Sequence, residues 1–156
     1  MEAKRVEDSK TEQTYYVRYP YLNSMNRLFG GQLLAWIDEV AGLVGRRHSG
    51  KDVITACIDN LHFKQGANLN DMIVLVGKVT HVGSTSIEVR VDTYREDNDG
   101  TRTPINRAYL VMVAIGEDGK PSKVPGLILE NPAEEMEWEN AVKRRELRLK
   151  RKQEGY

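Results

Sequence analysis

The stretch "NSMNRLFGGQLLAWIDEVAGLVGRR", residues 23–47, decides the fold. From residue 32 to residue 48 the chain is apolar on nearly every side, which is typical of a buried helix. Two glycines, Gly30 and Gly31, open this helix, and Asp38 lies in its middle. Glycine costs a helix about 1 kcal/mol relative to alanine, and an unpaired buried carboxylate costs more. We therefore expect these residues to do more than fill a core.

One broad face of the predicted helix consists mostly of small residues and carries the aspartate: Gly31, Leu34, Asp38, Ala41, Gly42 and Gly45. Small residues allow another backbone or a ligand to approach closely. The N–H groups of Gly30 and Gly31 lie at the positive end of the helix without helical partners, so they suit an incoming carbonyl oxygen. The residues alone leave two alternatives open: the glycine pair as a packing device, and Asp38 as a satisfied structural carboxylate.

In most of the rest of the chain, the pattern of apolar residues is typical of β-strands. We expect a short strand in residues 15–23, then strands in residues 53–66, 71–83, 86–94 and 105–116. Residues 131–156 are predicted to form a helix with Asn131 as N-cap and Pro132 at its first position. This order predicts an α+β fold in which an antiparallel sheet covers one central helix. Either the sheet curls around the helix or a second copy of the chain completes its cover.

The length, charge and composition of the chain limit the classes of function that it can have. With 156 residues, one domain is expected. The 23 basic and 23 acidic residues balance, so nucleic acid and anionic membrane are not expected as partners. No stretch is predicted to span a membrane, and one cysteine and three histidines form no spaced metal cluster. We expect a cytoplasmic protein with no metal, in which residues 1–14 are a mobile arm, residues 15–130 the folded domain and residues 131–156 a helical extension.

Several motifs together resemble the hotdog-fold acyl-CoA thioesterases, closest to the cytosolic acyl-CoA hydrolase branch: "FGGQLLAWIDEVAG" (29–42), "ITACIDNLHF" (54–63), "VGSTSIEV" (82–89) and "AYLVMVAIGEDGKPSKVP" (108–125). The resemblance implies a hotdog fold, a sheet wrapped around one long helix. It also implies homo-oligomers, with dimers assembling into tetramers or hexamers. The implied activity is hydrolysis of acyl-CoA to a fatty acid and CoA, without a cofactor, since CoA enters as part of the substrate.

The same resemblance assigns roles to residues. Asp38 would be the general base or nucleophile, and Asn23 from another subunit would position water or the carbonyl, with Asn26 held in reserve. Many relatives have glycine where Asn26 stands, so we expect this asparagine to adopt a positive φ angle. The N–H groups of Gly30 and Gly31 would hold the thioester oxygen.

The CoA phosphates would lie near the turn that consists of Gly83, Ser84, Thr85 and Ser86. Lys64 and Arg107 are further candidates for phosphate contacts, because ammonium and guanidinium groups suit phosphate oxygens. Both are equally compatible with solvated charges at strand ends. For the C-terminal helix, the alternatives are a solvated extension and a basic contact to an acidic ligand or a partner subunit. For the whole protein, the alternative to hydrolysis is an acyl-CoA binding or sensing protein without turnover.

Overall fold

The quoted stretch forms one long helix, α2 (Gly30–Ser49), as predicted. The computed structural model describes residues 1–59 and 61–156 of the chain. The helix ends where Gly50 adopts a left-handed conformation, with φ of 68°, because glycine enters this region without steric cost. Basic residues in the last turn, Arg46, Arg47 and His48, face the negative end of the helix dipole.

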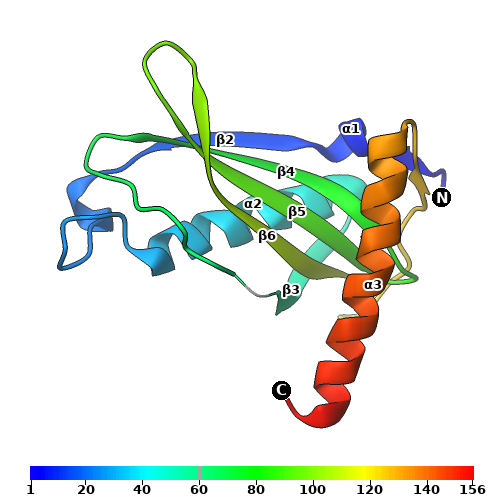
Figure 1. Cartoon of the computed structure of the whole chain (residues 1–156). Helices are drawn as coiled ribbons and strands as arrows, with labels where there is room; N and C mark the ends of the chain where they lie inside the picture. The colour runs from blue at the N-terminus through cyan, green and yellow to red at the C-terminus, as the bar shows by residue number, and fades with distance from the viewer. Residues whose placement is uncertain (60) are drawn as a thin grey trace.

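A five-stranded antiparallel sheet curls around this helix (Figure 1). Its strands in spatial order are β2 (Thr11–Tyr16), β4 (Met72–Val82), β5 (Ser86–Glu96), β6 (Arg102–Ile115) and β3 (Asp52–Ile58). The architecture predicted from the sequence is confirmed. The strand expected in residues 53–66 is shorter than predicted, since β3 ends at Ile58; residue 60 lies outside the described residues.

The N-terminal segment differs from the expected mobile arm. Residues 1–14 contain β1 (Lys4–Arg5), α1 (Val6–Ser9) and most of β2. Val6 is buried, and β2 pairs with β4 along its whole length. A short 3-10 helix (Tyr19–Tyr21) follows. The local sequence is polar, so the two strands of this segment depend on long-range pairing, of β2 with β4 and of β1 with β7 (Leu127–Ile128).

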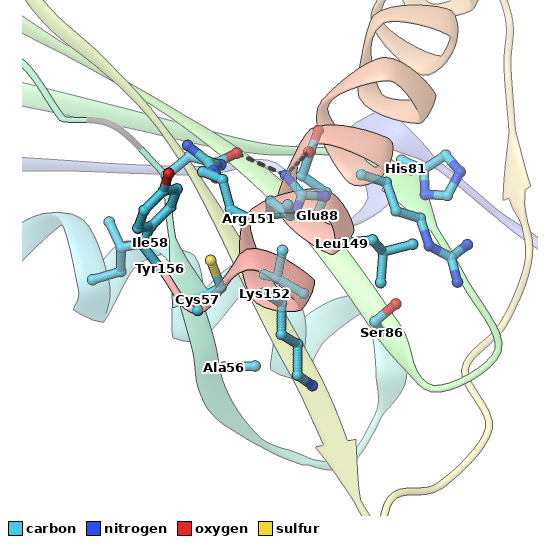
Figure 2. Close-up of a pocket in the computed structure, with 15 residues that line it drawn as sticks. Ala56, Cys57, Ile58, His81, Ser86, Glu88, Leu149, Arg151, Lys152 and Tyr156 are labelled. Carbon is cyan, nitrogen blue, oxygen red and sulfur yellow. Dashed lines mark hydrogen bonds and ion pairs between the residues drawn. The ribbon is translucent and has the colours of Figure 1, made fainter.

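The second long helix, α3 (Pro132–Glu154), crosses the face of the sheet opposite α2 (Figure 1). The predicted N-cap is confirmed, because the Asn131 side chain accepts a hydrogen bond of 2.9 Å from the backbone N–H of Glu134. Beneath the C-terminal half of α3 lies a cavity, and Figure 2 shows its lining.

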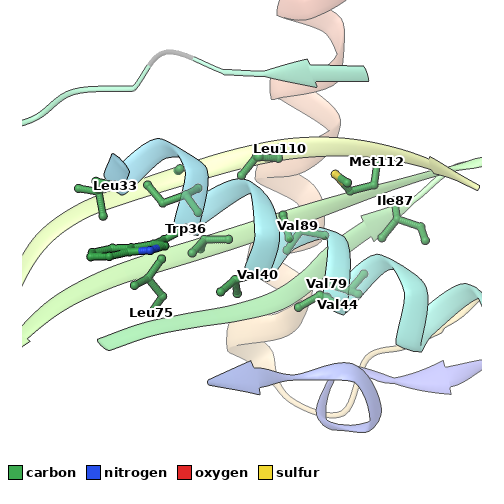
Figure 3. Close-up of a cluster of buried hydrophobic side chains, with 14 of the residues drawn as sticks. Leu33, Trp36, Val40, Val44, Leu75, Val79, Ile87, Val89, Leu110 and Met112 are labelled. Carbon is green, nitrogen blue, oxygen red and sulfur yellow. The ribbon is translucent and has the colours of Figure 1, made fainter. Parts of the chain in front are cut away.

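The hydrophobic core lies between α2 and the concave face of the sheet (Figure 3). The helix contributes a stripe that includes Leu33, Trp36, Val40 and Val44, and the Trp36 ring stacks on Tyr15 with 4.4 Å between ring centroids. On the opposite side of α2, Leu34, Asp38, Gly42 and Leu43 are left partly exposed by the part of the chain that the structure describes, although the helix sequence is apolar nearly all round. That side carries Asp38. Within the described part of the chain, no helix is both long and apolar enough to cross a membrane.

Candidate active site

Asp38 is held in place by a hydrogen bond from β3. Thr55 Oγ1 donates to Asp38 Oδ1 over 2.6 Å, and the aspartate remains partly exposed on the uncovered side of α2. An ionised carboxylate has two acceptor oxygens, so Oδ2 remains for water or a substrate. The sequence analysis missed Thr55, because a threonine in a strand is ordinary and its partner is 17 residues away along the chain.

The start of α2 presents two backbone donors beneath aromatic rings. The first helical hydrogen bonds run from the N–H groups of Gln32 and Leu33 to Phe29 O, so the N–H groups of Gly30 and Gly31 precede the helical ladder. A β-carbon on Gly31 would lie 2.5 Å from the Phe29 ring, so a larger residue here would displace this ring, which is 55% exposed. A β-carbon on Gly30 would lie 3.6 Å from the ring of Phe63.

The loop before the helix is shaped by its asparagines. Asn23 Oδ1 accepts hydrogen bonds from the backbone N–H groups of Met25, over 2.8 Å, and Arg27, over 3.2 Å. Asn26 has a φ angle of 58°, which confirms the predicted left-handed conformation. The carbonyl oxygen of the Asn23 side chain is thus used to hold the loop, whereas its amide N–H groups are the part that a ligand can engage.

Two adjoining cavities extend from the helix start. The first, of about 460 Å³, is lined by Asn23, Gly30 and Lys64 among others. The second, of about 430 Å³, is lined by Lys64 and Arg107 among others, and the two cavities share Lys64, Gln65 and Ile105. The structure therefore places Asn23, Gly30 and Lys64 around one cavity and Arg107 in the adjoining one. Arg107 already pairs with Asp92, with 2.7 Å between Nε and Oδ1.

The turn from Gly83 to Ser86 lies elsewhere. Its backbone closes through a 2.9 Å hydrogen bond from Gly83 N to Ser86 O, and the carbonyls of Ser84 and Thr85 accept from Val124 and Ala114. Ser86 lines the cavity beneath α3, on the face of the sheet opposite α2. Asp38 is not among the residues that line these three cavities. One chain thus holds the predicted site residues in three separate places.

Comparison with known proteins gives consistent results. The model of the thioesterase superfamily matches residues 25–101. A Bacillus subtilis protein named as an uncharacterized acyl-CoA thioester hydrolase is 34% identical over 152 residues, which are 97% of this chain and 88% of the relative.

Solved structures agree over nearly the whole chain. A hexameric acyl-CoA thioesterase without ligand has a TM-score of 0.91 and 40% identity, and the match covers 97% of both chains. An acyl-CoA hydrolase from Staphylococcus aureus, solved with butyryl-CoA, CoA and CoA disulfide, has a TM-score of 0.92 and 31% identity, over 97% of this chain and 93% of the other.

Proposed function

Because this chain belongs to the thioesterase superfamily, we propose that it hydrolyses acyl-CoA thioesters with Asp38 as general base or nucleophile. The hydrogen bond from Thr55 to Asp38 carries this proposal, because it fixes a carboxylate on a side of α2 that the chain leaves open. The free oxygen takes a proton from water as the water attacks the thioester carbonyl, or it attacks that carbon itself. With Asp38 as base, the C–S bond breaks, the acyl group leaves as the fatty acid, and the proton that Asp38 took from water passes to the thiolate of CoA. With Asp38 as nucleophile, the C–S bond breaks as an acyl–Asp38 anhydride forms, the thiolate takes a proton from water, and a second water hydrolyses the anhydride to release the fatty acid.

The helix start supplies the complementary part of the chemistry. We assign the N–H groups of Gly30 and Gly31 to the oxygen of the tetrahedral intermediate, where negative charge develops. The Phe29 and Phe63 rings lie beside these glycines and are themselves 55% and 51% exposed. CoA is then part of the substrate, and the reaction as written uses no further cofactor.

The relatives support the choice of residues. The Staphylococcus aureus hydrolase was also solved as three variants in which an asparagine, an aspartate or a threonine is replaced by alanine. The intervals between those three positions equal the intervals between Asn23, Asp38 and Thr55. Thr55 therefore joins the candidate site as a positioning residue for the carboxylate.

We propose that a complete site needs a second subunit. β3 is an edge strand whose Ile54 side chain is 56% exposed, so a second copy can extend the sheet there. Thr55 ties Asp38 to this same strand, which would place the carboxylate near a partner's Asn23. The hexameric relative described above supports this proposal, in which dimers associate into a hexamer. Lys64 and Arg107 would meet the CoA phosphates at the far end of the adjoining cavities.

Thiol release from a series of saturated acyl-CoAs, from acetyl-CoA to stearoyl-CoA, tests the proposal. Wild type should turn over part of the series. Asp38→Asn keeps the shape of the side chain and should lower kcat by about 100-fold or more. Glu39→Gln, an exposed neighbour on the same helix, is the matched control and should retain activity. If wild type binds acyl-CoA without releasing thiol, the protein is a binding module, and turnover retained by Asp38→Asn refutes the assigned base.

A further inference from the structure

Asn106 is a buried polar residue at the end of an apolar row. On β6, every second residue from Ala108 to Ala114 packs in the core against α2, and Asn106 occupies the next position of that row. Asn106 is only 8% exposed, and the facing residue on β5, Thr93, is fully buried. Burying an amide is costly unless it is hydrogen-bonded. An apolar residue would therefore suit this place better, unless the amide has another role.

The amide of Asn106 connects β6 to the loop that follows β3. Its Nδ2 donates to the backbone oxygen of His62 over 3.0 Å, whereas Oδ1 is buried without a partner among the described residues. The pairing of β3 with β6 ends at Ile58 and Leu110, so Asn106 lies beyond it. The side-chain amide thus binds the chain at a place where strand pairing no longer does.

The loop of residues 61–66 is held at its two ends. The hydrogen bond from Asn106 holds one end, and the other end is followed by Ala67, whose carbonyl oxygen accepts from the N–H of Leu28 over 2.8 Å. Within residues 1–59 and 61–156, no hydrogen bond other than that from Asn106 links residues 61–66 to another segment. Without the amide, the loop backbone would be hydrogen-bonded to its surroundings at one end only.

Two side chains of this loop reach the candidate site. The Phe63 ring lies 3.6 Å from the position of a β-carbon on Gly30, and Phe63 lines the cavity that Asn23 and Gly30 also line. Lys64 lines this cavity and the adjoining one, whose wall includes Asn106. Figure 1 shows the connection from β3 to β4 passing the start of α2. The loop therefore forms part of the wall of both cavities, next to the assigned oxyanion donors.

We propose that Asn106 is a positioning residue of the thioesterase site, which holds the loop so that Phe63 and Lys64 form a wall against which the acyl-CoA binds. This inference rests on the proposed function. Asp38 is held by Thr55 of β3, which Asn106 does not contact. Loss of the amide should therefore weaken the binding of acyl-CoA rather than slow the chemical step, and a loss of uniform binding raises KM without lowering kcat.

Steady-state kinetics of thiol release by Asn106→Leu tests the proposal. Leucine continues the apolar row and removes the amide, so KM for acyl-CoA should rise about 10-fold while kcat changes less than about threefold. The Tm should change by less than about 5 °C. Asn106→Ala, which cannot overpack the row, gives the same comparison if leucine prevents folding. Thr93→Val removes a buried hydroxyl that has no partner among the described residues, and this matched control should keep KM within about twofold.

Tryptic cleavage reports on the loop without any activity. Lys64 is the sole lysine or arginine between Lys51 and Lys78, so cleavage in the loop gives two fragments that mass spectrometry identifies. Asn106→Leu should be cut after Lys64 at least about 10-fold faster than wild type, because a released loop enters the protease more often. Thr93→Val should be cut at the wild-type rate.

A double variant shows whether Asn106 acts through Phe63. Phe63→Ala removes the ring from the wall and should raise KM by itself. Since both changes remove the same wall, the KM of the double variant should exceed that of the weaker-binding single variant by less than about threefold. An unchanged KM in Asn106→Leu overturns the proposal, as do an unchanged rate of cleavage after Lys64 and KM increases that multiply in the double variant. If wild type releases no thiol, the proposed function fails, and the Kd for acyl-CoA replaces KM in the same comparison, so the two failures are distinguishable.

Discussion

Replacing Glu88 with alanine is predicted to destabilise the protein by releasing α3 from the sheet. The Glu88 side chain is nearly fully buried and accepts hydrogen bonds from Thr80, Arg144 and Arg148. Removing one partner of a buried ion pair costs about 3–5 kcal/mol. Arg148 keeps Asp59 as a partner, so we expect the lower end, about 3 kcal/mol. For a domain of this size, that lowers Tm by about 6–12 °C.

The pH dependence identifies the cause. Burial raises the pKa of Glu88, but the hydrogen bonds from Arg144 and Thr80 and the charge of Arg144 outweigh burial, so the pKa lies below its usual value. The stabilisation is therefore complete above the unfolded pKa, about 4.3, and is lost as the pH falls through the lower, folded pKa. The stabilities of wild type and Glu88→Ala in thermal unfolding should therefore converge only as the pH falls through that folded pKa. The exposed Glu146→Ala is the control and should change stability by about 0.5 kcal/mol or less. A neutral-pH difference below 1 kcal/mol for Glu88→Ala would refute this reasoning.

Three further variants test other parts of the structure. Gly31→Ala would place a β-carbon against the Phe29 ring. We therefore expect kcat for thiol release to fall at least about 10-fold while the fold persists. An unchanged kcat would contradict the assignment of the Gly30 and Gly31 N–H groups to the oxyanion. Thr55→Val removes the hydrogen bond to Asp38 and should lower kcat about 10- to 100-fold with little change in KM, whereas a change in KM alone would indicate a role in binding. Burial lowers the pKa of His48, so the free energy of unfolding of wild type should decrease as the pH falls below about 6.5. In chemical unfolding, His48→Gln should show a weaker dependence of this free energy on pH. An equally steep dependence in the variant would contradict the role of His48.

The elements were predictable where local chemistry determines them. The apolar run and the terminal glycine fixed α2, and Asn131 with Pro132 fixed the start of α3. The N-terminal segment was not predictable, because its strands form only through pairing with β4 and β7. The length of β3 was overestimated, since the alternation of its sequence continues beyond the last residue that pairs with β6.

The candidate site was predictable only in part. Asp38, Gly30 and Gly31 can be identified from the sequence, because such residues destabilise a buried helix unless they have another role. Thr55 and Phe63 carry no such signal, and their contacts arise from the folding of β3 and its following loop against α2. The resemblance assigned the turn from Gly83 to Ser86 and the cations Lys64 and Arg107 to phosphates of the same ligand. Within one chain, Ser86 lines the cavity beneath α3, whereas Lys64 and Arg107 line another cavity.

If Asp38 of one subunit acts with Asn23 of another, two inactive variants should complement each other. Thiol release by Asp38→Asn and Asn23→Ala chains expressed together under separate tags, compared with each variant alone, tests this. If the site is shared, each mixed dimer contains one intact site, and random pairing should restore about a quarter of wild-type activity to two inactive variants. Activity no greater than that of the separate variants, in mixed dimers isolated by both tags, would contradict a shared site.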